Sequence, residues 1–85
     1  IAIVVGETVS SAEVLQTIRK FGGELLVEAE PFDVFRGEKL GLGRKSIAIR
    51  LEFSHPERSL ESTEVDEWVE KIIQGLKQEH DASLR

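Results

Sequence analysis

The chain is 85 residues long, which allows one domain with a thin core, since 40% of its residues are hydrophobic. It contains no cysteine, which excludes a disulfide framework, a thiolate metal site and a thiol nucleophile. Its net charge of −5 argues against a basic coat over the whole chain that binds nucleic acid indiscriminately.

The first residues are apolar and β-branched. Residues 1–5 (Ile-Ala-Ile-Val-Val) predict a strand, and they lack the charged region and cleavage site of a signal peptide. No apolar run in the chain approaches the length of a membrane span. Because position 1 is not methionine, we expect residues 1–85 to be a single domain cut from a longer chain.

A helix and a second strand are predicted next. Residues 10–13 (Ser-Ser-Ala-Glu) have the spacing of a capping box, a serine followed three residues later by a glutamate. Apolar residues then recur at helical intervals on one face, and Gly22–Gly23 ends the helix. Residues 25–36 predict a strand.

The second half of the chain predicts a hairpin loop, a strand, a helix and a short strand. Residues 37–45 contain three glycines, and residues 46–53 alternate cleanly between apolar and polar. Apolar residues from Val65 to Leu76 follow the helical repeat, and residues 82–85 predict a final strand. The order βαββαβ predicts a ferredoxin-like α+β fold, a four-stranded antiparallel sheet with two helices on one face. We expect function on the helix-free face.

The apolar pattern of the second strand changes parity at Pro31. Proline cannot donate to a strand ladder, so we expect an edge position or a one-residue bulge there. A bulge would keep Phe32 and Val34 facing inward and would turn Asp33 and Phe35 onto the helix-free face. The residues expected on that face of the following strand are Ser46, Ala48 and Arg50.

A short basic segment stands out in this acidic chain. Residues 36–50 hold five basic side chains and one acidic side chain, Glu38. Cations gathered in one segment predict a docking surface for an anion. Together with the preceding aromatic and carboxylate side chains they suit single-stranded nucleic acid, because phosphates are neutralised, a base stacks and a base edge is read. The predicted phosphate contacts are Arg36, Lys39, Arg44, Lys45 and Arg50.

Several stretches resemble one protein family. They are residues 32–37 (Phe-Asp-Val-Phe-Arg-Gly), 45–48 (Lys-Ser-Ile-Ala), 58–60 (Arg-Ser-Leu) with Glu64–Val65, and the closing Leu84–Arg85. The chain resembles the ferredoxin-fold anticodon-binding domain at the C-terminus of the bacterial phenylalanyl-tRNA synthetase beta subunit. The resemblance covers essentially the whole chain, in motif order and in spacing.

This resemblance implies a module that binds the anticodon stem-loop of phenylalanine tRNA. Catalysis would lie in the alpha subunit of an assembly of two alpha and two beta subunits that uses ATP, magnesium and phenylalanine. No catalytic residue, cofactor or metal is therefore expected in this domain. The implied partners are the tRNA, the alpha subunit and the other domains of the beta subunit, in the cytoplasm and without a membrane.

The same resemblance implies three base-contacting residues, Asp33, Phe35 and Ser46. Phe35 stands where the family usually has tyrosine, so it keeps the stacking surface and lacks the phenol hydrogen bond. The Asp33 carboxylate only accepts hydrogen bonds, which suits the N–H groups of the wobble guanine in the phenylalanine anticodon. The Ser46 hydroxyl is able to donate or accept at a base or a ribose.

Two functions from other classes stay open. One is a small-molecule-binding regulatory domain, which rests on fold analogy alone. The other is an acylphosphatase-like enzyme, which needs an arginine–asparagine pair, and the chain contains no asparagine. The glycines of residues 37–46 do not form a phosphate loop, because the glycine–lysine adjacency of that motif is missing and a strand follows.

Overall fold

A computed structural model describes residues 1–84, except for the side chain of Glu38. Arg85, which the sequence places in the last strand, lies outside the described residues. In chain order the elements are β1 Ala2–Gly6, α1 Ser11–Gly22, β2 Leu26–Phe35, the 3₁₀ turn η1 Glu38–Leu40, β3 Arg44–Phe53, α2 Ser62–His80 and β4 Ser83–Leu84.

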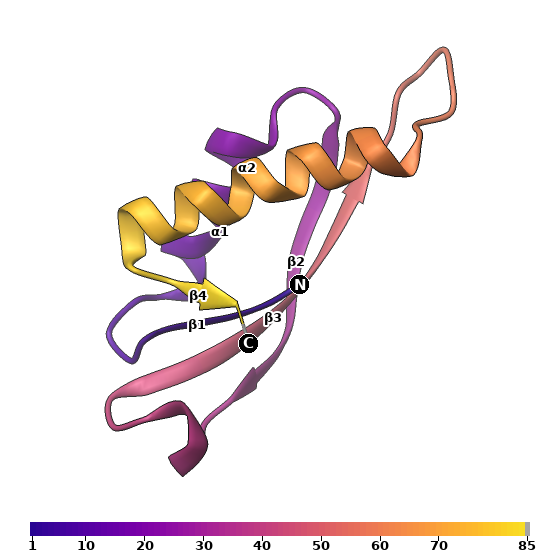
Figure 1. Ribbon diagram of the computed structural model, residues 1–85. Coiled ribbons are helices and arrows are strands. Elements are labelled where there is room, and N and C mark those ends of the chain that lie inside the picture. Colours follow the sequence, from indigo (N-terminus) through magenta and orange to yellow (C-terminus); the bar gives the residue numbers. More distant parts are fainter. Residues whose placement is uncertain (85) are drawn as a thin grey trace.

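The strands form one sheet in the order β2-β3-β1-β4, and every neighbouring pair is antiparallel. Both helices lie on the same side of this sheet (Figure 1). The predicted ferredoxin-like α+β fold is therefore confirmed. The molecule is elongated, with extents of 45 × 20 × 20 Å, and the hairpin of β2 and β3 reaches beyond the helices at the end that carries η1 (Figure 1).

Helix α1 begins and ends where the sequence predicts. The hydroxyl of Ser10 accepts a hydrogen bond from the backbone N–H of Glu13 at 3.1 Å, which caps the first turn. Gly23 follows the helix with a φ of 71°, a value that favours glycine. The ring of Trp68 also lies against Gly23, where a Cβ would be only 2.7 Å from it. Gly23 thus stops α1 and lets α2 pack closely.

Helix α2 is held at its start by charged side chains. Glu61 is the N-cap, and a capping box joins it to Glu64. Arg58, in the preceding loop, donates to both carboxylate oxygens of Glu64 at 2.7 Å.

Farther along α2, a Cβ on Gly75 would lie 2.2 Å from the ring of Phe21, so this glycine allows α1 and α2 to approach each other.

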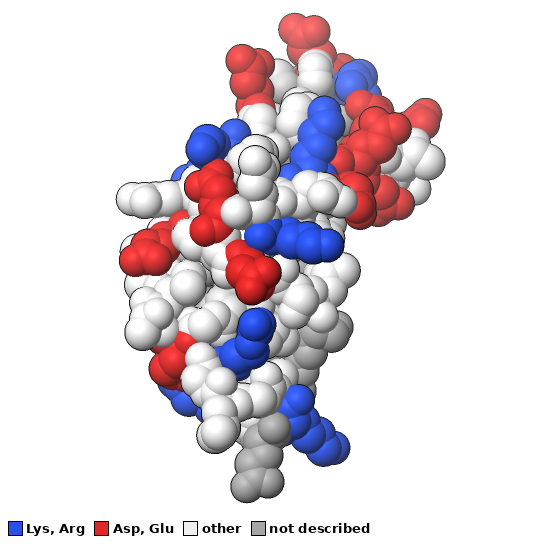
Figure 2. Space-filling model, turned by 60° about the vertical axis from the view of Figure 1, so that its left-hand side comes forward, with Lys and Arg blue, Asp and Glu red and all other residues white. Residues whose placement is uncertain are grey.

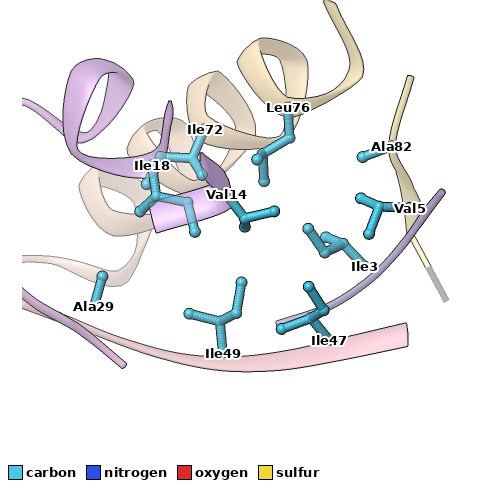
Figure 3. Close-up of a cluster of buried hydrophobic side chains, with 10 residues drawn as sticks. All are labelled: Ile3, Val5, Val14, Ile18, Ala29, Ile47, Ile49, Ile72, Leu76 and Ala82. Carbon is cyan, nitrogen blue, oxygen red and sulfur yellow. The ribbon is translucent and has the colours of Figure 1, made fainter. Parts of the chain in front are cut away.

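The core fills the space between the helices and one face of the sheet. Side chains from the central strands point up toward side chains from both helices (Figure 3). The core residues are Ile3, Val5, Val14, Ile18, Ala29, Ile47, Ile49, Ile72, Leu76 and Ala82. Since Ile47 and Ile49 alternate with Ser46 and Ala48, the latter two lie on the face that has no helices.

The predicted bulge at Pro31 is confirmed. Pro31 pairs with Ile49 whereas Asp33 pairs with Ala48, so Phe32 is an extra residue in β2. β2 is an edge strand, as its proline requires. Beyond the bulge, Val34 pairs with a core residue and keeps the helix side, but it is still 40% exposed because the helices do not cover this end of the hairpin.

The sequence placed the start of β3 too late and missed one irregularity. β3 begins at Arg44, because Arg44 and Lys45 pair with Gly6 and Val5 of β1. A second register shift lies between Leu26 and Glu28 in β2. The apolar alternation of residues 25–29 gave no sign of this shift.

Candidate functional site

An aromatic ring and a carboxylate lie on the helix-free face at the far end of β2. Phe35 pairs with Ser46 and Asp33 pairs with Ala48, which places both side chains on the face opposite the core. Asp33 is exposed, and Phe35 is 44% exposed. A Cβ on Gly37 would meet the Phe35 ring at 3.0 Å, so the ring lies against the chain where it leaves the strand. A surface for stacking thus stands beside a hydrogen-bond acceptor.

Ser46 shares this face and is nearly covered. It pairs with Phe35 on one side and with Val4 on the other, and only 2% of it is exposed. Its hydroxyl is therefore reachable by a ligand only if a neighbouring side chain moves. The sequence indicated the residue type and the face but gave no sign of this burial.

Three of the five predicted phosphate contacts lie within reach of carboxylates. The Arg36 guanidinium contacts Glu7, with its Nε 2.9 and 3.0 Å from the two carboxylate oxygens. Arg50 donates from Nη2 to Glu30 at 2.9 Å. These ion pairs are exposed and would have to open, or share the cation, for a phosphate to bind.

Arg44 is the third cation within reach of a carboxylate, but its contact is loose. Nη2 of Arg44 lies 3.9 Å from a carboxylate oxygen of Asp81. Arg44 has the parity of Ser46, so it lies at the edge of the helix-free face. Lys39 is exposed in η1, and it has no ion pair among the residues that the structure describes. These two cations are the most available to a phosphate.

Lys45 differs from the other four cations. It pairs with Val5 of β1, has the parity of the core residue Ile47, and is only 8% exposed. Its charge still acts locally, because it helps to lower the pKa of Glu7. The sequence predicted a phosphate contact here, and the fold leaves this side chain little surface for one.

The ion pairs shift the pKa values of their members. The hydrogen bond from Arg36 lowers the pKa of Glu7, and the same contact raises the pKa of Arg36. The hydrogen bond to Glu30 raises the pKa of Arg50, and the charges of Glu28 and Glu52 act in the same direction. Arg50 therefore lies among three carboxylates, which makes it a poor phosphate ligand.

Sequence reasoning missed the acidic partners of these arginines. Glu30 lies directly opposite Arg50 in the register, so a correct bulge and hairpin alignment would have found it. Glu7 follows β1, which is separated from β2 by β3, so no local pattern relates it to Arg36.

Acidic side chains are concentrated toward one end of the molecule. Acidic side chains gather at the upper end of Figure 2, where the loop between β3 and α2 lies in Figure 1. Basic side chains are visible toward the lower end, where the hairpin that carries η1 lies. In this view the hairpin end has fewer acidic side chains around its cations, so it is the more favourable end for a polyanion.

A mostly apolar groove lies on the helix side of the sheet. It has a volume of about 570 Å³ and is lined by Phe32 and Phe53 from the sheet and by Val65 and Val69 from α2, among others.

Among the described residues no group of three or more His, Asp or Glu side chains is placed to hold a metal ion. None of the helices within residues 1–84 combines the length and the apolar character needed to cross a membrane.

Comparisons with known proteins give a consistent result. The family model of the ferredoxin-fold anticodon-binding domain matches residues 1–85. The phenylalanine–tRNA ligase beta subunit of Shewanella oneidensis is 45% identical over 100% of this chain. The beta subunits of Bacillus subtilis and Bdellovibrio bacteriovorus are 38% and 37% identical, over 100% and 99% of it. The chain spans only 10–11% of the length of these relatives.

Proposed function

The chain belongs to the ferredoxin-fold anticodon-binding domain family, and from this premise we propose that it binds the anticodon stem-loop of phenylalanine tRNA. The domain works within the beta subunit of a phenylalanine–tRNA ligase. It positions the tRNA for an aminoacylation that the alpha subunit carries out with ATP and magnesium, in a cytoplasmic assembly of two alpha and two beta subunits.

The observation that carries this proposal is the position of Phe35 beside Asp33 on the helix-free face. The exposed ring offers a platform for an unpaired base, an interaction worth about 1–3 kcal/mol per base. The neighbouring carboxylate accepts hydrogen bonds from N–H groups, which guanine presents on its Watson–Crick edge. Ring and acid together select for an unstacked guanine, as a wobble position provides.

We propose that Ser46 also contacts a base, once a neighbouring side chain has moved. Because its hydroxyl is covered in the free domain, it joins the site only when a bound base displaces the ring of Phe35 or another neighbour. Side-chain rearrangements of this size are common when partners bind.

Phosphate contacts favour the hairpin end of the molecule. Lys39 and Arg44 are proposed as the main contacts, because they are the least engaged by carboxylates. Arg36 contributes through the part of its guanidinium that Glu7 does not occupy. Lys45 and Arg50 contribute less, since the first is covered and the second is surrounded by acids. Few phosphate contacts give weak and salt-dependent binding.

The decisive experiment is a titration of the chain with a phenylalanine anticodon stem-loop and with one whose wobble guanine is replaced by adenine. Saturable binding that prefers guanine supports the proposal. Equal binding of both stem-loops removes the base-reading role and leaves a general RNA contact.

The groove lined by Phe32 and Val69 offers a place for the alternative, a small-molecule-binding regulatory domain. Saturable binding of an amino acid or a nucleotide, with no RNA binding in the same buffer, would favour a regulatory domain over an anticodon-binding domain. Of the proposed RNA contacts only Arg50 also lines this groove, so the two titrations report on largely separate surfaces.

A further inference from the structure

A charged contact joins the ends of two strands that are not neighbours in the sheet. Glu7 follows β1 and Arg36 follows β2, while β3 lies between these strands. Nε of Arg36 donates to the carboxylate at 2.9 and 3.0 Å, and Nη2 lies 2.8 Å from the same carboxylate. A contact through two nitrogens fixes the plane of the guanidinium as well as its distance.

Both residues are also tied to their surroundings. The backbone N–H of Glu7 donates to the carbonyl of Gly43 in the hairpin at 2.7 Å. Arg36 stands between Phe35 and Gly37, and the Phe35 ring lies against Gly37. The contact between Glu7 and Arg36 therefore links the end of β1, the hairpin and the short segment that carries the ring.

The geometry leaves part of the arginine available. The carboxylate occupies the Nε edge of the guanidinium, whereas Nη1 of Arg36 has no partner among the described residues. The Arg36 side chain is 58% exposed, so solvent or a ligand reaches this second edge. An arginine held at one edge presents the other in a fixed orientation, which a lysine cannot do.

We infer that Glu7 is a positioning residue for RNA: it orients Arg36 toward a backbone phosphate and steadies the segment that carries Phe35. This inference rests on the proposed function. It leads to an expectation opposite to that of simple charge repulsion, because removing an acid near a polyanion ordinarily strengthens binding. Loss of the Glu7 carboxylate weakens binding instead.

The test is a double-variant cycle on the 85-residue chain. Affinity for the anticodon stem-loop is measured for wild type, Glu7→Gln, Arg36→Gln and the double variant. Glu7→Gln alone is expected to weaken binding about fivefold, as for the loss of a charge-assisted contact. In the Arg36→Gln background the same change is expected to cause no further loss, because the residues act as one unit, and any effect should be the gain that follows from removing an unpaired acid near a polyanion.

A matched control is Glu79→Gln. Glu79 forms a similar exposed ion pair, with Lys20 at 3.0 Å, and joins the two helices away from the RNA face. This variant removes the same charge and is expected to leave affinity unchanged. Thermal unfolding of every variant confirms that each chain is folded, since exposed ion pairs of this kind contribute little to stability.

Two results would overturn the inference while the proposed function stands. One is Glu7→Gln binding as tightly as wild type or more tightly. The other is an equal loss from Glu7→Gln in both backgrounds, which would mean that Glu7 acts without Arg36. If wild type itself does not bind the stem-loop, the proposed function fails, and the inference fails with it.

Discussion

Phe35 lies directly opposite Ser46 at the last paired step of the β2–β3 hairpin, with the ring partly exposed and the serine covered. The two residues sit on the face of the sheet that carries no helix, so neither contributes to the core. If a base stacks on this ring as proposed, it lies next to the strand position that carries the serine hydroxyl.

Replacing Phe35 with alanine is expected to weaken RNA binding by about 1–3 kcal/mol, the range for one lost stacking contact. Stability should change less, because 44% of the ring is already exposed. Isothermal titration and thermal unfolding measure the two effects. The matched control is Phe32→Ala, which removes a 65% exposed ring from the same strand on the helix side. Its RNA affinity should equal that of wild type.

Replacing Asp33 with asparagine is expected to reduce the preference for guanine. The amide presents one acceptor and one donor group where the carboxylate presents two acceptors, so it no longer matches two N–H groups of one base edge. The preference for the guanine stem-loop over the adenine stem-loop should fall about tenfold, the scale of one lost charged hydrogen bond. An unchanged ratio, measured by competition, would show that Asp33 does not read the base.

The salt dependence of binding separates exposed from covered cations. Lys39→Gln is expected to lower the slope of log affinity against log salt by about 0.7, the value for one phosphate contact with a single strand. Lys45→Gln removes the same charge from a side chain that is only 8% exposed, and its slope should stay close to that of wild type. An equal decrease in slope for Lys39→Gln and Lys45→Gln would show that Lys45 also contacts a phosphate.

The contact between Arg58 and Glu64 should make stability depend on pH in acid. The hydrogen bond from Arg58 lowers the pKa of Glu64 below its ordinary value of 4.5, so its stabilising effect is complete above that value. The effect is lost as the pH falls through the lowered pKa. Glu64→Gln should therefore be less stable than wild type near neutral pH, and the two melting temperatures should converge in acid. A constant difference at all pH values would exclude this origin.

Gly75→Ala is expected to destabilise the domain although alanine favours helices by about 1 kcal/mol. The new Cβ would overlap the ring of Phe21, and forced overpacking costs about 1–3 kcal/mol. Chemical denaturation measures the net effect. In the background of Phe21→Ala the ring is gone, so the same change at Gly75 should become stabilising. An equal loss of stability from Gly75→Ala in the wild-type and Phe21→Ala backgrounds would show that overlap with the Phe21 ring is not the cause.

The sequence predicted the fold well because its signals are local. The Ser10 cap, the glycines after Phe21 and the strict alternation of residues 46–53 each act through neighbours in the chain, and the structure confirms them. Of the capping box predicted at Ser10 and Glu13, the structure shows the half in which the Ser10 hydroxyl accepts from the Glu13 backbone. The bulge at Pro31 was also predictable, since a proline and a change of apolar parity coincide there.

The sequence predicted the face of the sheet on which the ring and the acid lie. It did not predict the contacts that the charged side chains make. Alternation placed Asp33 and Phe35 correctly, because a single bulge sets the parity of everything after it. The burial of Lys45 and the pairing of Glu7 with Arg36 depend on which strands lie side by side and on where the helices stop. Those are properties of the assembled sheet, which a charge pattern along the chain does not contain.

The bulge at Pro31 and the second register shift of β2 also bear on self-association. A ten-residue strand at the edge of a sheet offers unpaired backbone groups to any passing strand, which is a common route to aggregation. Pro31 removes one of the donors, the register shifts interrupt the ladder near its start and in its middle, and Glu28 and Glu30 add like charges between them. The bulge that turns Asp33 and Phe35 onto the helix-free face therefore also disfavours this edge as a template for a sheet between copies of the chain.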